Sequence, residues 1–163
     1  MDRFDSALFL LRTVFGLFLA FHGINKVKNG IAGTAGWFAS IGMKWPGLQA
    51  RTAAATEIGA GMMLAVGLAT PVACAAIVAT MLVAIITVHW RVGFFIFLPN
   101  GGWEYCASII ATAAALAISG PGRFSLDHAF GWELSAPTGL FAVGAGAALA
   151  VVHLVVSHRP KGD

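Results

Sequence analysis

Six residues with ionisable side chains lie near the ends of the apolar stretches of this chain and are candidates for binding or proton transfer. They are His22, Lys26, Glu57, His89, Arg91 and Glu104. His22 and Lys26 are four residues apart, so a helix would place them on one face. A His or Lys can hydrogen-bond a carbonyl oxygen, and a neighbouring carboxylate, kept ionised by the positive charge, can relay a proton. A quinone offers two such carbonyls, so these residues are candidates for a quinone-binding site.

The same six residues have a second, purely structural interpretation. Opposite charges at helix ends can form a ring of salt bridges that fixes the register of the helices, and structural ion pairs perturb charges as readily as functional sites do. The residue types alone do not separate the two interpretations, so both remain open at this point.

The sequence around these residues is strongly apolar. Hydrophobic residues make up 58% of the 163 residues and charged residues only 10%, whereas soluble domains carry about 25% charged residues. This composition predicts an all-α protein, a polytopic bundle of transmembrane helices in contact with a lipid bilayer. It excludes a soluble globular domain, and the net charge of +3 without a basic patch excludes a nucleic-acid-binding protein.

Five apolar stretches could form the bundle, because a membrane-spanning helix needs about 20 mostly apolar residues. We expect helices over residues 4–24, 53–68, 72–89, 104–118 and 138–156. Back-and-forth threading of these helices would bring the six candidate residues to one face of the membrane. We expect a single transmembrane domain over residues 1–163, with a four-helix core at 4–127 and an additional C-terminal helix at 138–156. Residues 34–41 are expected to form a short amphipathic helix at the interface.

Arg12 and Asp127 are a further pair of interest. Arg12 lies well inside the first apolar stretch, and a guanidinium cannot escape the cost of burial by losing its proton. By topology, Asp127 in the loop after the fourth helix is the nearest acid. We therefore predict a structural ion pair between them, with ligand binding by this pair as the alternative.

Other kinds of site have weaker support in the sequence. His22, His89 and His153 fall toward the same membrane face and could in principle bind haem or a metal. No Glu-x-x-His pair accompanies them, so we predict no metal site and no covalently bound cofactor. No nucleotide-binding or hydrolase motif is present, so whether the protein is an enzyme stays open. Cys74 and Cys106 fall at opposite membrane faces, which predicts two buried, unpaired thiols.

Small residues recur at four-residue spacing over 107–115 and over 142–150. In lipid, helices associate by close approach of their backbones, so such rows are typical of packing seams. A seam that the bundle itself leaves unused would allow a homo-oligomer.

Six short motifs follow one another along the chain: FHGINK (21–26), GTAGWFASIG (33–42), EIGAGMMLAVGL (57–68), GFF (93–95), WEY (103–105) and GPGRFSLD (120–127). In this order and spacing, over about residues 4–127, the chain resembles the DoxX family of small bacterial membrane proteins. By motif, the positions that match the recurring polar positions of the family are His22, Gly23, Lys26, Glu57, Glu104 and Asp127. The additional helix at 138–156 departs from the family pattern.

The resemblance implies a multi-pass four-helix bundle in the bacterial inner membrane. Several members of the family are described as components of membrane oxidoreductases, and the related DoxD proteins are subunits of a thiosulfate:quinone oxidoreductase. The resemblance therefore implies a subunit or anchor of an oxidoreductase system that carries no redox cofactor of its own. Such a subunit would work with a soluble or membrane-bound oxidoreductase partner and could bind quinone.

Two other functions remain as alternatives. A small-solute transporter or channel could use the same polar cluster, although the cluster is expected at one membrane face and paired broken helices are absent from the sequence. A structural or assembly protein would use the polar residues only to lock its helices together.

Overall fold

The protein is described by a computed structural model that covers residues 2–132 and 135–159. Its elements are α1 (Arg3–Lys28), α2 (Ile31–Ser40), α3 (Pro46–Val66), α4 (Thr70–Ala84), the π-helical turn η1 (Ile85–His89), α5 (Glu104–Ser119), α6 (Leu126–Ala129) and α7 (Ala136–Ser157). The described residues form helices and no strands, so the predicted all-α bundle is confirmed.

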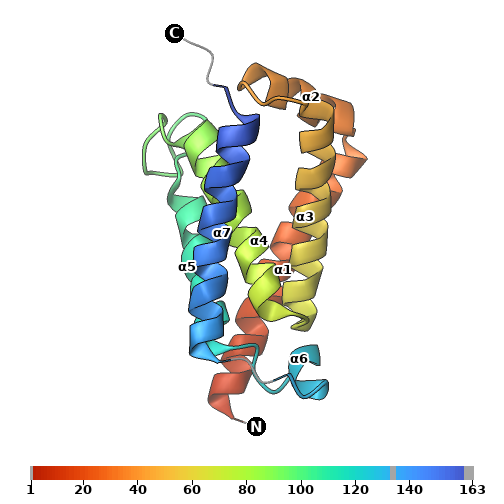
Figure 1. The fold of residues 1–163 in the computed structure, drawn as a ribbon, viewed down its shortest axis with the longest axis vertical. Helices are drawn as coiled ribbons and strands as arrows, with labels where there is room; N and C mark the ends of the chain where they lie inside the picture. Colours follow the sequence, from red (N-terminus) through yellow and green to blue (C-terminus); the bar gives the residue numbers. More distant parts are fainter. Residues whose placement is uncertain (1, 133–134, 160–163) are drawn as a thin grey trace.

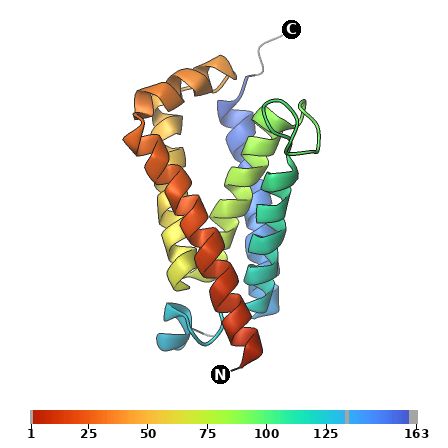
Figure 2. The same cartoon turned by 180° about the vertical axis from the view of Figure 1, so that it is seen from behind.

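The long helices form two groups. α1 packs along α3, and α4 packs against both α5 and α7. The groups meet near the α3–α4 turn and α6, at what we call the α6 end (Figure 1). Toward the opposite end, where α2 lies across the tops of the helices, α1 diverges from α4 and α5 (Figure 2). We call this second end the α2 end.

Among the described residues, three helical segments are long and apolar enough to cross a membrane: α1, the continuous stretch Thr70–His89, and α7, with 26, 20 and 22 residues. Many large apolar side chains on these helices point outward; Phe141 and Val155 of α7, for example, are each 77% exposed. Such surfaces are stable only against lipid or another apolar surface. The chain is therefore an integral membrane protein.

α3 begins seven residues earlier than the sequence predicted, at Pro46 rather than at residue 53. Proline suits the first turn of a helix because its missing N–H has no partner there in any case. The polar residues of this first stretch had suggested a loop. As a result, Gln49 and Thr52 lie on a helix that faces the interior of the bundle.

Three glycines set the separation of α1 and α3. A Cβ atom on Gly16 would lie 2.5 Å from the carbonyl oxygen of Gly61, and one on Gly61 would lie 2.5 Å from that of Gly16. One end of the contact is extended by Gly23, whose Cβ would lie 2.7 Å from the carbonyl oxygen of Ala54. The two backbones therefore touch, as small residues allow in membrane helices.

The two predicted rows of small residues have different outcomes. On α7 the row is buried, and a Cβ on Gly146 would lie 2.5 Å from the carbonyl oxygen of Ala75 on α4, so this packing seam is confirmed. On α5, Ala111 and Ala115 are exposed, so the bundle itself leaves this row unused. α5 packs instead through larger residues, among them Ile109 and Leu116.

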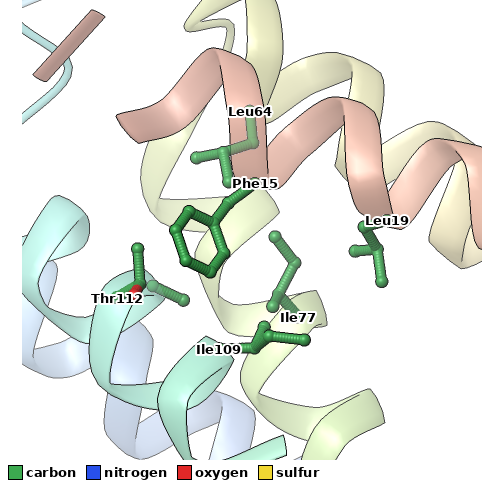
Figure 3. Close-up of a pocket in the computed structure, with 7 residues that line it drawn as sticks. Phe15, Leu19, Leu64, Ile77, Ile109 and Thr112 are labelled. Atoms are coloured by element: carbon green, nitrogen blue, oxygen red, sulfur yellow. The ribbon is translucent and has the colours of Figure 1, made fainter. Parts of the chain in front are cut away.

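The interior is filled between the two ends. Side chains from α1, α3, α4 and α5 converge there (Figure 3), and they are Phe15, Leu19, Leu64, Ile77, Ile109 and Thr112. The space left between them is about 10 Å³, roughly room for one water molecule. Cys74 and Cys106 are buried, unpaired thiols in the same core, as predicted.

At the α6 end, Arg12 and Asp127 are both buried, with 1% and 0% of their surface exposed. Arg12 donates through Nη1 to the carbonyl oxygen of Ala65 (2.5 Å) and through Nη2 to that of Phe124. Asp127 accepts from the backbone N–H groups of Ala69 (2.6 Å) and Thr70 (2.9 Å). The two residues thus share one buried cluster, but two backbone caps replace the direct ion pair that the sequence predicted.

The reason for this correction lies in the helix ends themselves. The last carbonyls of a helix carry partial negative charge, and the first N–H groups carry partial positive charge, and neither set has a partner within the helix. Arg12 binds the end of α3 and Asp127 binds the start of α4, so each charge meets a complementary helix end. Asp127 also holds Ala69 in a left-handed conformation (φ 44°) that non-glycine residues rarely adopt.

The glycine contact generates a first prediction. Gly61→Ala should lower the free energy of unfolding by about 1–3 kcal/mol, because the added methyl group collides with the backbone of α1. Gly59→Ala is the matched control, since a Cβ at Gly59 meets nothing within 4 Å. This control should be neutral or stabilising by up to about 1 kcal/mol. Thermal unfolding in detergent measures both, and equal stability of the two variants would contradict the packing described here.

A second prediction concerns the caps at the α6 end. Asp127→Ala should destabilise the protein by at least about 2 kcal/mol, because two backbone N–H groups lose their acceptor. This corresponds to a fall in Tm of about 4–8 °C. The neighbouring His128→Ala, at an exposed position, should change Tm little. A Tm of Asp127→Ala equal to that of the wild type would show that the caps do not hold the turn.

Candidate functional site

A cavity of about 800 Å³ lies between the two groups of helices at the α2 end. Its walls come from α1, α3, α4 with η1, α5 and α7, and α2 contributes Trp37 and Phe38. Its volume is within the range of small-molecule sites, which are mostly apolar with a few polar groups that orient the ligand. The lining follows that pattern, and we refer to this space as the α2-end cavity.

Four of the six residues predicted as a site line this cavity: His22, Lys26, Glu57 and His89. They come from three helices and are separated by up to 67 positions, and the threading of the chain brings them together as expected. The other two, Arg91 and Glu104, are not among the described residues of the lining.

Lys26 and Glu57 form an ion pair between α1 and α3. Lys26 Nζ lies 2.5 Å from Glu57 Oε1 and also contacts Oε2. The Glu57 side chain is 8% exposed and that of Lys26 is 23% exposed. A carboxylate buried this deeply needs such a partner, because leaving it unpaired in a low-dielectric interior costs several kcal/mol.

The geometry of α1 and α3 explains why these two side chains meet. The helices run in opposite directions, and side chains tilt toward the N-terminus of their own helix. Lys26, near the end of α1, therefore points back into the bundle, and Glu57 points toward the α2 end. The close approach at Gly23 and Ala54, one turn away, leaves a gap that the two side chains can span.

His22 lies one turn before Lys26, at an exposed position at the rim of the cavity. Its ring faces that of Tyr105 on α5, with centroids 6.5 Å apart. Tyr105 also lines the cavity. A phenol and an imidazole, each able to donate or accept a hydrogen bond, therefore flank the side of the cavity between α1 and α5.

His89 ends the π-helical turn η1 on the opposite wall. Its Nδ1 lies 2.7 Å from the carbonyl oxygen of Gly101. Because a carbonyl oxygen only accepts a hydrogen bond, Nδ1 is the donor in this contact. Turns of π-helix often occur at functional sites, where they change the direction of a side chain.

Arg91 lies on the aromatic loop between η1 and α5, and Glu104 is the first residue of α5, directly after this loop. Glu104 Oε2 accepts a hydrogen bond from the backbone N–H of Ile96 (3.1 Å), so its carboxylate holds the loop. Arg91 is exposed on the same loop. The sequence placed these residues correctly at one end of the bundle but could not foresee that the folded loop would engage Glu104.

The cavity also contains polar residues that the sequence analysis did not assign to the site: Gln49, Thr52, Thr56, Tyr105, His153 and Ser157. Gln49 and Thr52 were missed because α3 was expected to begin after them. From the sequence alone, His153 was considered as a haem or metal ligand and otherwise as an interfacial residue. Its spacing from Leu149, Val156 and Ser157 marks one face of α7, and this signal could have placed it on the cavity wall.

The arrangement favours binding of a neutral ring with polar substituents over binding of a metal ion. Within residues 2–132 and 135–159, no group of three or more His, Cys, Asp or Glu side chains is placed to hold a metal. The cavity instead offers an ammonium donor paired with a carboxylate, three imidazoles and one phenol around apolar walls. Such groups can hydrogen-bond carbonyl or hydroxyl oxygens and exchange protons with them.

Comparison with known proteins points to one family. A sequence model of the DoxX family matches residues 7–90, which include most of α1 and all of α2, α3, α4 and η1. The chain is 32% identical over 124 residues to a Bacillus subtilis (strain 168) protein named "Putative oxidoreductase CatD". That match covers 76% of this chain and 87% of CatD.

No solved structure matches the chain. The family assignment therefore rests on the sequence model and on CatD, and it agrees with the resemblance in the ordered motifs. The chain belongs to the DoxX family.

Proposed function

We propose that this protein is a quinone-binding subunit of a membrane oxidoreductase, with the quinone ring held in the α2-end cavity against the Lys26–Glu57 pair. The observation that carries the proposal is this buried ion pair on the wall of an apolar cavity of about 800 Å³. The name of CatD, which describes that protein as an oxidoreductase, supports the redox part of the proposal.

The chemistry of the cavity wall suits a quinone. The Lys26 ammonium has three protons, and the carboxylate of Glu57 engages it from one side. The remaining donor capacity can serve a quinone carbonyl. A quinone that is reduced to quinol takes up two electrons and two protons. Electrons would come from an oxidoreductase partner, while His22 at the exposed rim could return protons to the pair from solvent.

The proposed setting is the bacterial inner membrane, where the long helices α1, α3, α4 with η1, α5 and α7 all cross the bilayer. α1, α4 with η1, and α7 meet the length and apolarity of a spanning segment by themselves. α3 and α5 pack between or beside them in the same bundle (Figure 1). α3 is less apolar because it carries Gln49 and Glu57, which face the cavity.

Titration of the purified protein with a benzoquinone tests the proposal. The variants His22→Ala and Glu57→Gln should each bind at least about tenfold more weakly, the loss expected for one charge-assisted hydrogen bond. Arg51→Ala, exposed on α3 outside the cavity, is the control and should bind as the wild type does. Unchanged affinity in both His22→Ala and Glu57→Gln would place the quinone elsewhere.

A double variant separates this proposal from a purely structural role of the ion pair. Replacing a buried ion pair by apolar residues of similar volume is often neutral or stabilising. Lys26→Met combined with Glu57→Leu should therefore fold and lose quinone binding. If this double variant folds and still binds quinone, the pair is not the binding group. A second double variant, Lys26→Met with Glu57→Gln, is measured beside it. If the amount of folded protein in the membrane falls equally in both double variants, the ion pair is needed for folding and the proposal fails.

A further inference from the structure

The α2-end cavity has an apolar side that the proposed ring site does not use. On α3 this side is formed by Leu48, and on α7 by Leu149, Val152 and Val156. The four aliphatic side chains of this group are each more than half exposed although they line the cavity. A side chain that lines the cavity and is also exposed on the outer surface of the protein lies at the edge of an opening.

This opening lies between α3 and α7. Among the described residues, the two helices share no extensive packing interface; α3 packs on α1, α2 and α4, while α7 packs on α4 and α5. In Figure 1, α7 and α3 stand apart over the half of the bundle nearest α2, and residues of both helices line the cavity. We refer to this opening as the α3–α7 mouth.

The end of the cavity under α2 is covered. The connection between α2 and α3 is hydrogen-bonded to the end of α7, through Lys44 N–H to the carbonyl oxygen of Ser157 (2.7 Å) and Arg159 N–H to that of Gly42 (2.9 Å). The Lys44 ammonium adds a bond to the carbonyl oxygen of Val156 (2.7 Å). These hydrogen bonds connect the two groups of helices at the α2 end, where the groups diverge (Figure 2).

The covering residues are apolar and aromatic. Trp37, Phe38, Ile41 and Met43 line the cavity from the α2 side, and Met43 is only 6% exposed. These side chains and the hydrogen-bonded connection close the cavity beneath α2 on the side of α7. The α3–α7 mouth, with aliphatic rims on two membrane helices, faces the bilayer instead.

We propose that the ligand of the cavity is an amphiphile that enters from the bilayer, with its polar ring at Lys26 and Glu57 and its hydrocarbon tail passing out through the α3–α7 mouth. The inference rests on the proposed function and adds the substrate class: a long-tailed, lipid-soluble quinone rather than a water-soluble one. It also gives a role to α7, which lies outside the residues 7–90 that the family model matches.

The apolar rim explains why a tail would gain from this path. Burying hydrocarbon against Leu149, Val152 and Leu48 adds contact area on both sides of the tail while its outer part stays in lipid. A ring without a tail would make only the polar contacts at Lys26 and Glu57. Changes at the α3–α7 mouth should therefore alter the affinity for a quinone with a tail but not for the ring alone. Changes at the ion pair should alter the affinity for both.

The test compares two probes that share one ring: a benzoquinone with a decyl chain and the same ring with a methyl group in place of the chain. Binding is measured with the full chain in lipid nanodiscs. Val152→Trp and Leu48→Trp, on the two sides of the mouth, should each weaken binding of the decyl probe about tenfold. Binding of the methyl probe should not change, because the ring contacts remain.

Two matched controls lie on the same helices. Val151→Trp on α7 and Ala55→Trp on α3 place the same side chain at exposed positions that do not line the cavity, and neither should affect either probe. Thermal unfolding of all four variants confirms that the added Trp leaves the fold intact.

The outcomes separate the two proposals. If the wild type binds both probes through Lys26 and Glu57 but the mouth variants bind the decyl probe normally, the tail path is wrong and the proposed function stands. If mouth and control variants weaken decyl binding equally, the tail path is also wrong, because the effect does not come from the mouth. If the wild type binds neither probe, both proposals fail.

Discussion

Close contact between the backbones of α1 and α3 is the interaction on which the rest of the structure depends. Gly16, Gly23 and Gly61 bring the helices within van der Waals distance, where any larger residue would separate them. This separation allows Lys26 and Glu57 to pair across the interface. Two charged groups can then remain in an apolar bundle, because each neutralises the other and neither has to reach water.

The two ends of the bundle use their buried charges differently. At the α6 end, Arg12 donates a hydrogen bond to the end of α3, and Asp127 accepts hydrogen bonds from the start of α4. The helices converge at this end. At the α2 end, the helix groups diverge and are tied by the short connection at Gly42 and Lys44. The space left between them holds the Lys26–Glu57 pair at its wall. Stability is thus concentrated at one end and binding capacity at the other.

Much of the fold was predictable because membrane helices are long and apolar. The apolar stretches predicted the five long helices of the described residues. Prediction failed where polar residues lie on a helix that faces a cavity, as with Gln49 at the start of α3. It also failed where a side chain binds backbone rather than a charge, as with Asp127 and Glu104, since a backbone partner leaves no pattern in sequence.

The most direct measurement of the central claim is photolabelling with an azido-substituted quinone, followed by mapping of the labelled residues by mass spectrometry. A ring bound at the Lys26–Glu57 pair should label the facing segments of α1 and α3 at the α2 end, around His22 and Thr56. An excess of the unlabelled quinone should remove this label. Label spread over the lipid-facing side of α7, around Phe141, or label at the α6 end that excess quinone does not displace, would contradict the account.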